Sequence, residues 1–294
     1  MVDIDTLRAF VIISECGSFS LAAEKLFITQ PAVSKRINAL ESLLDTRLFD
    51  RIGKQVQLTE GGQILLPKAQ RILADIQDAA TAVKDLSGEV RGDLHVATSH
   101  HIGLHKLPPV LRDFAERYPK VNLRFEFLDS EVACERVLQG KCELALVTLP
   151  PQIDAPLAAT AIWHDPLVFI TSRQSAIAAD CTLAELSQTP AILPDLNTYT
   201  GQLIHRFFNE QGLNLNISMA TNFLETIKML CSVGLGWSVL PASMLDEQLK
   251  VLNVQSSTLK RDLGLVRHTG RTLSNAGQAF IARLNDTTPK ASKL

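Results

Sequence analysis

The stretch that most constrains the fold of this chain is residues 18–51, which hold two helical patterns separated by a few residues. The apolar face of the first helix is formed by Leu21, Ala22, Ala23 and Leu26. Ser18 or Ser20 can cap its first turn. The apolar face of the second helix is formed by Val33, Ile37, Leu40 and Leu44. Thr29 can cap this helix, and Pro31 suits its first turn, where the missing N–H needs no partner. Two short helices joined by a tight turn predict a helix-turn-helix unit.

Small, amide and basic side chains gather at the N-terminal end of the second helix, the end that such units place in the major groove. Gln30 can offer a donor and an acceptor together to an adenine edge. Ser34 can pair with a base edge or a phosphate, and Lys35 supplies a positive charge for a phosphate or a guanine. Pro31 and Ala32 keep the approaching surface small. An ordinary two-helix corner with solvated polar residues would show the same pattern, because short motifs have high false-positive rates.

Motifs spread along residues 22–62 point to one family. They are Ala22-Ala23, Thr29-Gln30-Pro31-Ala32-Val33-Ser34, Leu40-Glu41 with Leu44, Leu48-Phe49-Asp50-Arg51 and Leu58-Thr59-Glu60-Gly61-Gly62. This pattern closely resembles the N-terminal domain of LysR-type transcriptional regulators, and the length and layout of the rest also resemble that family. The resemblance covers essentially the whole chain and implies DNA contacts from Thr29, Gln30, Pro31, Ser34 and Lys35. Where the family usually has Gly after the recognition helix, this chain has Asp45, which also tolerates a left-handed cap.

Residues 48–58 predict a β-hairpin with Ile52, Gly53 and Lys54 at its tip. Residues 1–58 would then form a winged helix-turn-helix DNA-binding domain. The resemblance implies that Lys54 and Arg51 reach the DNA backbone or the minor groove beside the site. Hairpin charges that are merely solvated are the alternative.

The charge of the chain is weak for a nucleic-acid binder, with a net charge of -2. Residues 1–58 hold seven basic and seven acidic side chains, but residues 35–54 hold five basic against three acidic. The excess falls on the recognition helix and the segment after it. We therefore expect modest non-specific binding, with dimerisation needed for affinity.

The sequence shows no export signal and no apolar run long enough to cross a membrane, so a cytoplasmic location without membrane contact is expected. Five cysteines are spread widely without a Cys-x-x-Cys pair, which favours reduced, mostly buried thiols. A redox switch is the weaker alternative, because some members of the resembled family sense peroxide through cysteines.

Residues 59–88 predict a long helix that links the two halves of the chain. Its apolar seam repeats at alternating spacings of four and three over Leu65, Ala69, Ile72, Ile76, Ala79, Val83 and Leu86. Thr59 can cap this helix, and Pro67 can bend its first turns. Polar residues flank the seam, which favours pairing with a second copy; packing against the chain's own core is the weaker alternative.

Residues 91–294 predict an α/β effector-binding domain, because short apolar strands alternate with helices after a hinge at residues 87–92. The first block has strands at 94–98, 123–128 and 144–148 in βαβαβ order, and the second block has a strand at 167–171. Two such blocks resemble the two-lobed architecture of periplasmic binding proteins, which closes around a small ligand. Lobe I is expected at about 91–161 and 267–290, and lobe II at about 162–266. The fold class is therefore α/β, with an N-terminal winged helix-turn-helix domain and a long linker helix.

Ligands of such domains lie off the carboxyl ends of the strands, near helix N-termini that favour anions. This rule selects Ser99, His100 and His101 after one strand, Thr148 after another, and Thr200 with Gly201 at a helix start. Their hydroxyls suit a small carboxylate or oxyanion effector, and no other cofactor is expected. His100, His101 and His105 could instead bind a metal, but the spacing is loose and no cysteine or carboxylate stands nearby in sequence, so no metal site is predicted.

Two classes of function fit these patterns. The first is a transcriptional regulator that binds promoter DNA as a dimer or tetramer, senses a small effector and contacts RNA polymerase. The second is an enzyme or solute-binding protein built on the two-lobed part. Against an enzyme, the sequence has no Gly-x-Ser-x-Gly, no His-Glu-x-x-His and no P-loop.

Overall fold

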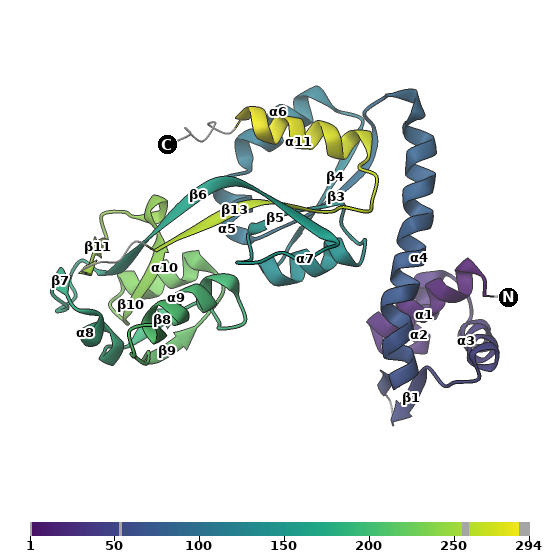
Figure 1. The fold of residues 1–294 in the computed structure, drawn as a ribbon, viewed down its shortest axis with the longest axis horizontal. Helices are drawn as coiled ribbons and strands as arrows, with labels where there is room; N and C mark the ends of the chain where they lie inside the picture. The colour runs from purple at the N-terminus through teal and green to yellow at the C-terminus, as the bar shows by residue number, and fades with distance from the viewer. Residues whose placement is uncertain (1, 53–54, 255–258, 288–294) are drawn as a thin grey trace. The chain divides into compact units, whose positions relative to one another are not determined.

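The computed structural model describes residues 2–52, 55–254 and 259–287. The chain divides near residue 87 into two compact units, which we call the head unit and the sensor unit (Figure 1). The head unit contains α1 (Ile4–Cys16), α2 (Phe19–Leu26), α3 (Gln30–Leu44), β1 (Phe49–Ile52), β2 (Gln55–Leu58), α4 (Glu60–Lys84) and the short 3₁₀ helix η1 (Asp85–Ser87). Strands β1 and β2 pair antiparallel, which confirms the predicted hairpin.

The ends of the first three helices follow the capping residues in the sequence. Asp3 accepts a hydrogen bond of 2.7 Å from the Thr6 amide, and Ser18 accepts one of 3.3 Å from the Leu21 amide. Helix α3 ends at Asp45, whose φ of 48° is left-handed, as predicted. Thr29 stands at the N-cap position of α3, although its hydroxyl makes no capping hydrogen bond within the described structure.

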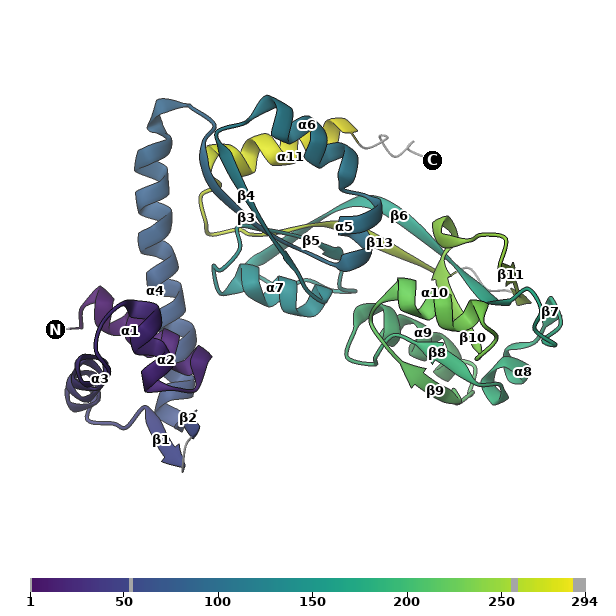
Figure 2. The ribbon, with the colours of Figure 1, turned by 180° about the vertical axis from the view of Figure 1, so that it is seen from behind.

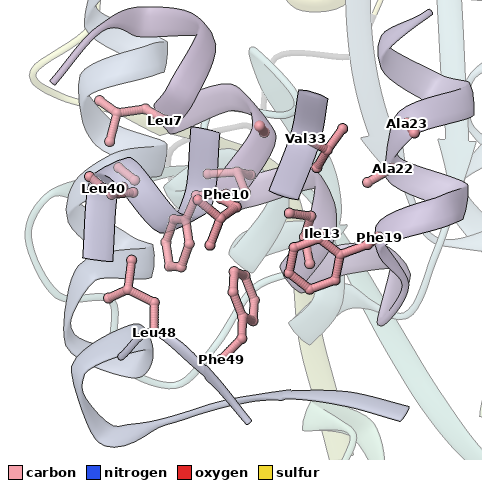
Figure 3. Packing of buried hydrophobic residues seen from close by; sticks show 14 residues of the cluster. Leu7, Phe10, Ile13, Phe19, Ala22, Ala23, Val33, Leu40, Leu48 and Phe49 are labelled. Atoms are coloured by element: carbon pink, nitrogen blue, oxygen red, sulfur yellow. The ribbon is translucent and has the colours of Figure 1, made fainter. Parts of the chain in front are cut away.

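The core of the head unit is built around three phenylalanines (Figure 3). The Phe49 ring from the hairpin lies 5.3 Å from that of Phe10 and 5.7 Å from that of Phe19. Val33, Ile37 and Leu40 of α3 are buried against this core, as predicted. Two residues assigned to the apolar faces, Leu21 and Leu44, are exposed instead, because they lie at the margins of those faces.

Helix α4 uses its apolar seam in two ways. At its N-terminal end, the seam residue Ala69 is buried in the head core, and Leu65 packs against it together with Leu66 and Leu73. Packing against the chain's own core, expected as the weaker alternative, is therefore correct for this end. Further along, the remaining large seam residues are exposed in the single chain: Ile72, Ile76, Val83 and Leu86.

The sensor unit is built on one continuous sheet of nine strands. Its helices are α5 (His100–His105), α6 (Pro108–Arg117), α7 (Ser130–Leu138), α8 (Leu183–Gln188), α9 (Tyr199–Asn209), α10 (Leu224–Ser232), the 3₁₀ helix η2 (Ala242–Met244) and α11 (Asn275–Thr287). The strands of the sheet are β3 (Gly92–Thr98), β4 (Val121–Phe127), β5 (Leu144–Thr148), β6 (Leu157–Ser172), β8 (Ala191–Leu193), β9 (Ile217–Ala220), β10 (Trp237–Pro241), β11 (Leu249–Val251) and β13 (Leu259–His268). Strand order is β4-β3-β5-β13-β6-β10-β8-β9, with β11 beside β6, and β7 (Asp180–Cys181) pairs separately with β12 (Asn253–Val254).

Strands β6 and β13 are the two connections between the lobes (Figures 1 and 2). They pair antiparallel over ten residue pairs, so β6 is far longer than the strand predicted at 167–171. The register shifts between Leu263 and Gly264, which leaves Ile162 unpaired in β6. Leu263 and Leu265 pack in the core of lobe I. The chain therefore passes from one lobe to the other within β6 and again within β13. The second crossing lies before residue 267, where the boundary was expected.

Helices cover both faces of each part of the sheet. In lobe I, α6 and α11 lie on one face and α7 on the other (Figures 1 and 2). The parallel pairing of β3 with β4 and β5 confirms the predicted βαβαβ order. In lobe II, Trp237 is fully buried, and its indole N–H donates to the carbonyl of Leu186 at 2.9 Å. None of the described helices is long and apolar enough to span a membrane.

Candidate effector cleft and DNA-contacting surface

The predicted DNA-contacting side chains lie at the N-terminal end of α3. Thr29, Gln30, Pro31 and Lys35 are exposed, and Ser34 is half-buried. The Gln30 amide donates to the Ser34 hydroxyl at 3.1 Å, so one predicted base-reading group holds the other in place. Within the same helix, Arg36 instead lies 3.6 Å from Asp5 of α1, an ion pair inside the head unit.

The hairpin residues predicted to contact DNA are described only in part. Arg51 lies in strand β1, paired with Val56, and Lys54 lies outside the described residues. A residue that the sequence interpretation missed is Phe27, at the turn between α2 and α3. Its φ is 56°, and its side chain is 95% exposed, although it is a large aromatic beside the recognition helix. The only sequence feature that could have predicted its exposure is its position in the turn between the two helices.

The three loops chosen by the carboxyl-end rule meet at one cleft in the sensor unit. Ser99, His100, His101, Thr148 and Thr200 all line this cavity, which has a volume of about 50 Å³.

Gly201 has a different role from the one predicted. It does not line the cavity, and its amide donates to the Thr198 hydroxyl at 3.1 Å. A methyl group on its Cα would overlap the carbonyl oxygen of Asp195. Gly201 therefore permits the close turn before α9 and offers no N–H to a ligand.

The most deeply buried charges at the cleft are Arg261 of β13 and Asp165 of β6. The Arg261 Nε donates to Asp165 Oδ2 at 2.9 Å, and its Nη2 lies 2.9 Å from the same oxygen without hydrogen-bond geometry. Its Nη1 donates to the Thr200 hydroxyl at 2.8 Å. Burial lowers the pKa of Arg261, and the Asp165 charge opposes that shift. Arg261 thus orients a predicted effector residue.

Two polar contacts join the lobes across the cleft. The Tyr199 amide, at the start of α9 in lobe II, donates to the Glu131 carboxylate of α7 in lobe I. The Asn222 amide of lobe II donates to Asp129 Oδ2 of lobe I at 2.7 Å. Burial raises the pKa of Glu131, while its hydrogen bonds with backbone amides lower it.

The three histidines that suggested a metal site separate into two environments. The His100 ring packs on aromatic rings, 5.4 Å from Phe127 and 4.8 Å from Phe223. His101 is buried and faces His105, with the two rings 4.9 Å apart. Burial, together with the positive charge of Arg261, lowers the pKa of His101 to about 3, so this imidazole is neutral at physiological pH.

The sequence interpretation missed several lining residues for different reasons. Asp129, Ser130 and Glu131 follow the end of β4, so the carboxyl-end rule could have selected them. Arg261 lies inside a strand, where no loop rule points. It is the middle one of three consecutive charged residues, Lys260, Arg261 and Asp262, so the sequence did not single it out.

Both halves of the chain match described sequence families. Residues 4–63 match "Bacterial regulatory helix-turn-helix protein, lysR family". Residues 87–289 match "LysR substrate binding domain". These two matches together span nearly the whole chain.

Relatives and solved structures agree with these matches. A probable RuBisCO transcriptional regulator of Thalassiosira pseudonana is 31% identical over 95% of this chain and 95% of its own. A full-length variant of OxyR from Pseudomonas aeruginosa has the same fold, with a TM-score of 0.68, 20% identity, and coverage of 99% of both chains. Full-length CbnR in complex with its target DNA is also similar in fold, with a TM-score of 0.54, 19% identity, and coverage of 97% of this chain and 99% of that one.

The matched families decide between the two classes of function considered. Both describe parts of transcriptional regulators, so the alternative of an enzyme or solute-binding protein is not supported. The chain belongs to the LysR family of transcriptional regulators.

Proposed function

We propose that the head unit inserts the N-terminal end of α3 into the major groove of promoter DNA. Thr29, Gln30, Pro31, Ser34 and Lys35 would form the interface, with the hairpin residues Arg51 and Lys54 beside it. The exposure of these α3 side chains on one helix end supports the assignment. The resolved CbnR complex with target DNA shows that a protein of similar fold binds DNA.

We further propose that two chains pair through the exposed seam of α4 and that two dimers form a tetramer. Such an assembly presents recognition helices in pairs, which compensates for the weak charge of a single head unit. RNA polymerase is the partner expected at the promoter. A cytoplasmic location follows from this role.

The DNA assignment is tested with a duplex that the full-length chain selects from a random pool. Lys35→Ala should weaken binding of all sequences and reduce the salt dependence by about one phosphate contact. Gln30→Ala should cost about 1–3 kcal/mol at one base pair and relax the preference there. Lys25→Ala, at an exposed position of α2, is the matched control. Equal affinity and preference in wild type and in both α3 variants would refute the assignment.

We propose that the effector is a small carboxylate or oxyanion bound in the cleft. The observation that carries this proposal is the Glu131 carboxylate, which already accepts the Tyr199 amide at the start of α9. Helix N-termini favour negative charge, and here a side chain of the other lobe supplies it. An effector anion would take the place of Glu131 at this amide.

Hydroxyl groups from both lobes support the same ligand class. Ser99 and Thr148 stand at strand ends in lobe I, and Thr200 stands in the first turn of α9. Arg261 donates to Thr200, which leaves the Thr200 O–H able to donate in turn to an anion. The acidic Asp129 and Glu131 disfavour an anion while both are charged, so displacement of Glu131 is part of the proposal.

Thermal unfolding of the full-length chain with small carboxylates, sulfate and phosphate tests the effector class. A ligand that binds the folded state raises the midpoint. Ser99→Ala should reduce the rise. Glu131→Ala should increase it at equal ligand concentration, because the competing carboxylate is gone. Glu135→Ala, an exposed acidic position on the same helix, should behave as wild type. If Glu131→Ala and Glu135→Ala respond alike, the displacement proposal fails.

A further inference from the structure

Three side chains with metal-binding chemistry converge beside the cleft from two distant segments. His101 and His105 lie four residues apart on α5, so they project from one face of that helix. Glu225 comes from the first turn of α10 in lobe II, 120 residues further along the chain. One donor atom from each of the three lies within 4.8 Å of the other two. The sequence alone hid this carboxylate, because it is adjacent only in the fold.

His101 is unusual among the polar residues of the structure. Its side chain is 5% exposed, and neither ring nitrogen has a hydrogen-bond partner in the described structure. Burial of an imidazole without hydrogen-bond partners is unfavourable relative to burial of a satisfied one. The charged Asp165 oxygen is 4.0 Å from Nε2 and is already paired with Arg261. The fold therefore maintains a buried imidazole whose two ring nitrogens lack a hydrogen-bond partner among the described residues.

We propose that His101, His105 and Glu225 form a binding site for a divalent transition-metal ion of the zinc type. Two imidazoles and one carboxylate suit such ions, and three protein ligands leave room for water as a fourth. Ligands around zinc lie about 3.4 Å apart, given metal–ligand bonds of about 2.1 Å. The ligand atoms, which lie up to 4.8 Å apart, must therefore approach one another by up to roughly 1.4 Å.

The contacts of the other two ligands support this site. His105 Nε2 already lies 2.9 Å from Glu225 Oε1, so two of the ligands are in contact. The nearby positive charge of Arg261 opposes a cation, but Asp165 neutralises it at 2.9 Å.

The proposed metal would connect the two lobes. Helix α5 belongs to lobe I, and α10 packs against β10 and β6 in lobe II. A metal bound by both would therefore favour the arrangement in which they approach. The site shares His101 with the lining of the effector cleft, but His105 and Glu225 do not line that cleft. Variants of His105 and Glu225 therefore test the metal independently of the proposed anion.

Zinc titration of the tag-free, full-length chain after treatment with a chelator tests the proposal. We expect one zinc per chain in the wild type, measured by calorimetry. His105→Ala and Glu225→Gln should each weaken binding at least about tenfold. Both positions are partly exposed, so these variants should fold, unlike changes at the buried His101. His164→Ala removes an exposed, carboxylate-paired histidine and should bind zinc as the wild type does.

Two further measurements separate this site from other sources of zinc binding. Cobalt added in place of zinc should give visible absorption of nitrogen and oxygen ligation, without the intense near-ultraviolet band of a thiolate. Zinc should raise the unfolding midpoint of the wild type but not that of Glu225→Gln. A thiolate band, or undiminished zinc affinity in His105→Ala and Glu225→Gln, would overturn the proposal.

Discussion

Arg261 and Asp165 are direct cross-strand partners in the pair of strands that connects the lobes, and their ion pair is almost fully removed from solvent. Each strand crosses between lobes, so this pair lies at the junction. Arg261 also holds the Thr200 hydroxyl, which lines the proposed effector site. One ion pair thus links the connection between the lobes to a residue of the proposed effector site.

Asp165→Asn should destabilise the sensor unit by about 3–5 kcal/mol, because it leaves the buried Arg261 charge without its counterion. Both tryptophans, Trp163 and Trp237, lie in this unit, so urea unfolding followed by tryptophan fluorescence reports on it selectively. Asp262→Asn is the matched control. It neutralises the residue that follows Arg261, whose ion pair with His164 is exposed, and should cost less than about 1 kcal/mol. Equal losses in the two variants would show that burial of the pair does not govern its contribution.

Short-range sequence signals predicted much of the fold. Asp3, Ser18 and Asp45 end or begin helices where their capping chemistry indicates, and strand β5 has the predicted bounds of 144–148. These helix ends and strand bounds depend on residues that are close in sequence, so they can be predicted from one sequence. The carboxyl-end rule likewise selected Ser99, Thr148 and Thr200, which line one cavity, because strand ends and helix starts can be recognised from local patterns.

Features that depend on distant pairing could not be read in the same way. Arg261 pairs with Asp165, which is 96 residues away in sequence, and His105 pairs with Glu225, which is 120 residues away. Nothing local to either residue specifies its partner. The α4 seam was misjudged at Ala69 for a similar reason: a heptad pattern shows that a surface is buried but does not say which core buries it.

The buried cysteines should react slowly with a disulfide reagent at pH 8, which argues against redox sensing by these thiols. Burial raises the pKa of Cys134 to about 11 and that of Cys231 to about 12. At pH 8 only about one in a thousand Cys134 side chains is a thiolate. Reaction with a disulfide reagent at pH 8 should therefore consume at most one thiol per folded chain quickly, and all five after denaturation. Cys16, which is half-buried, is the expected fast thiol. Its removal in Cys16→Ser should abolish the fast phase, and a second fast thiol would contradict the assignment.

Gly264→Ala should disturb the crossing between the lobes. An added methyl group would overlap the Thr160 carbonyl oxygen at the point where the β6–β13 register shifts. Since the Thr160 oxygen belongs to the backbone of a paired strand, relief requires the strands to move, and we expect a loss of about 1–3 kcal/mol. Lys260→Ala, at an exposed position of the same strand, should change stability by no more than about 0.5 kcal/mol. Tryptophan fluorescence during urea unfolding measures both, and a neutral Gly264→Ala would show that the strands accommodate the methyl group.

The exposed part of the α4 seam should control dimer formation. Val83 is 69% exposed and Leu86 84% exposed in the single chain, while the earlier seam residue Ala69 is already buried in the head core. Replacing Ile76 and Val83 together by Asp would place four charges in a two-fold interface and should weaken dimerisation at least about a hundredfold, or about 3 kcal/mol. Sedimentation over a range of chain concentrations measures this change.

The matched control for the seam is Gln77→Asp, which adds a charge on the same helix but on a face away from the seam. It should leave the dimer dissociation constant within about twofold of the wild-type value. Because Ile76 and Val83 do not belong to the head core, the double variant should retain the helical circular dichroism of the head unit. Loss of DNA affinity together with loss of the dimer would then follow from halving the number of recognition helices, not from unfolding. A double variant that remains dimeric at the concentrations where the wild type does would assign the dimer contact to another surface.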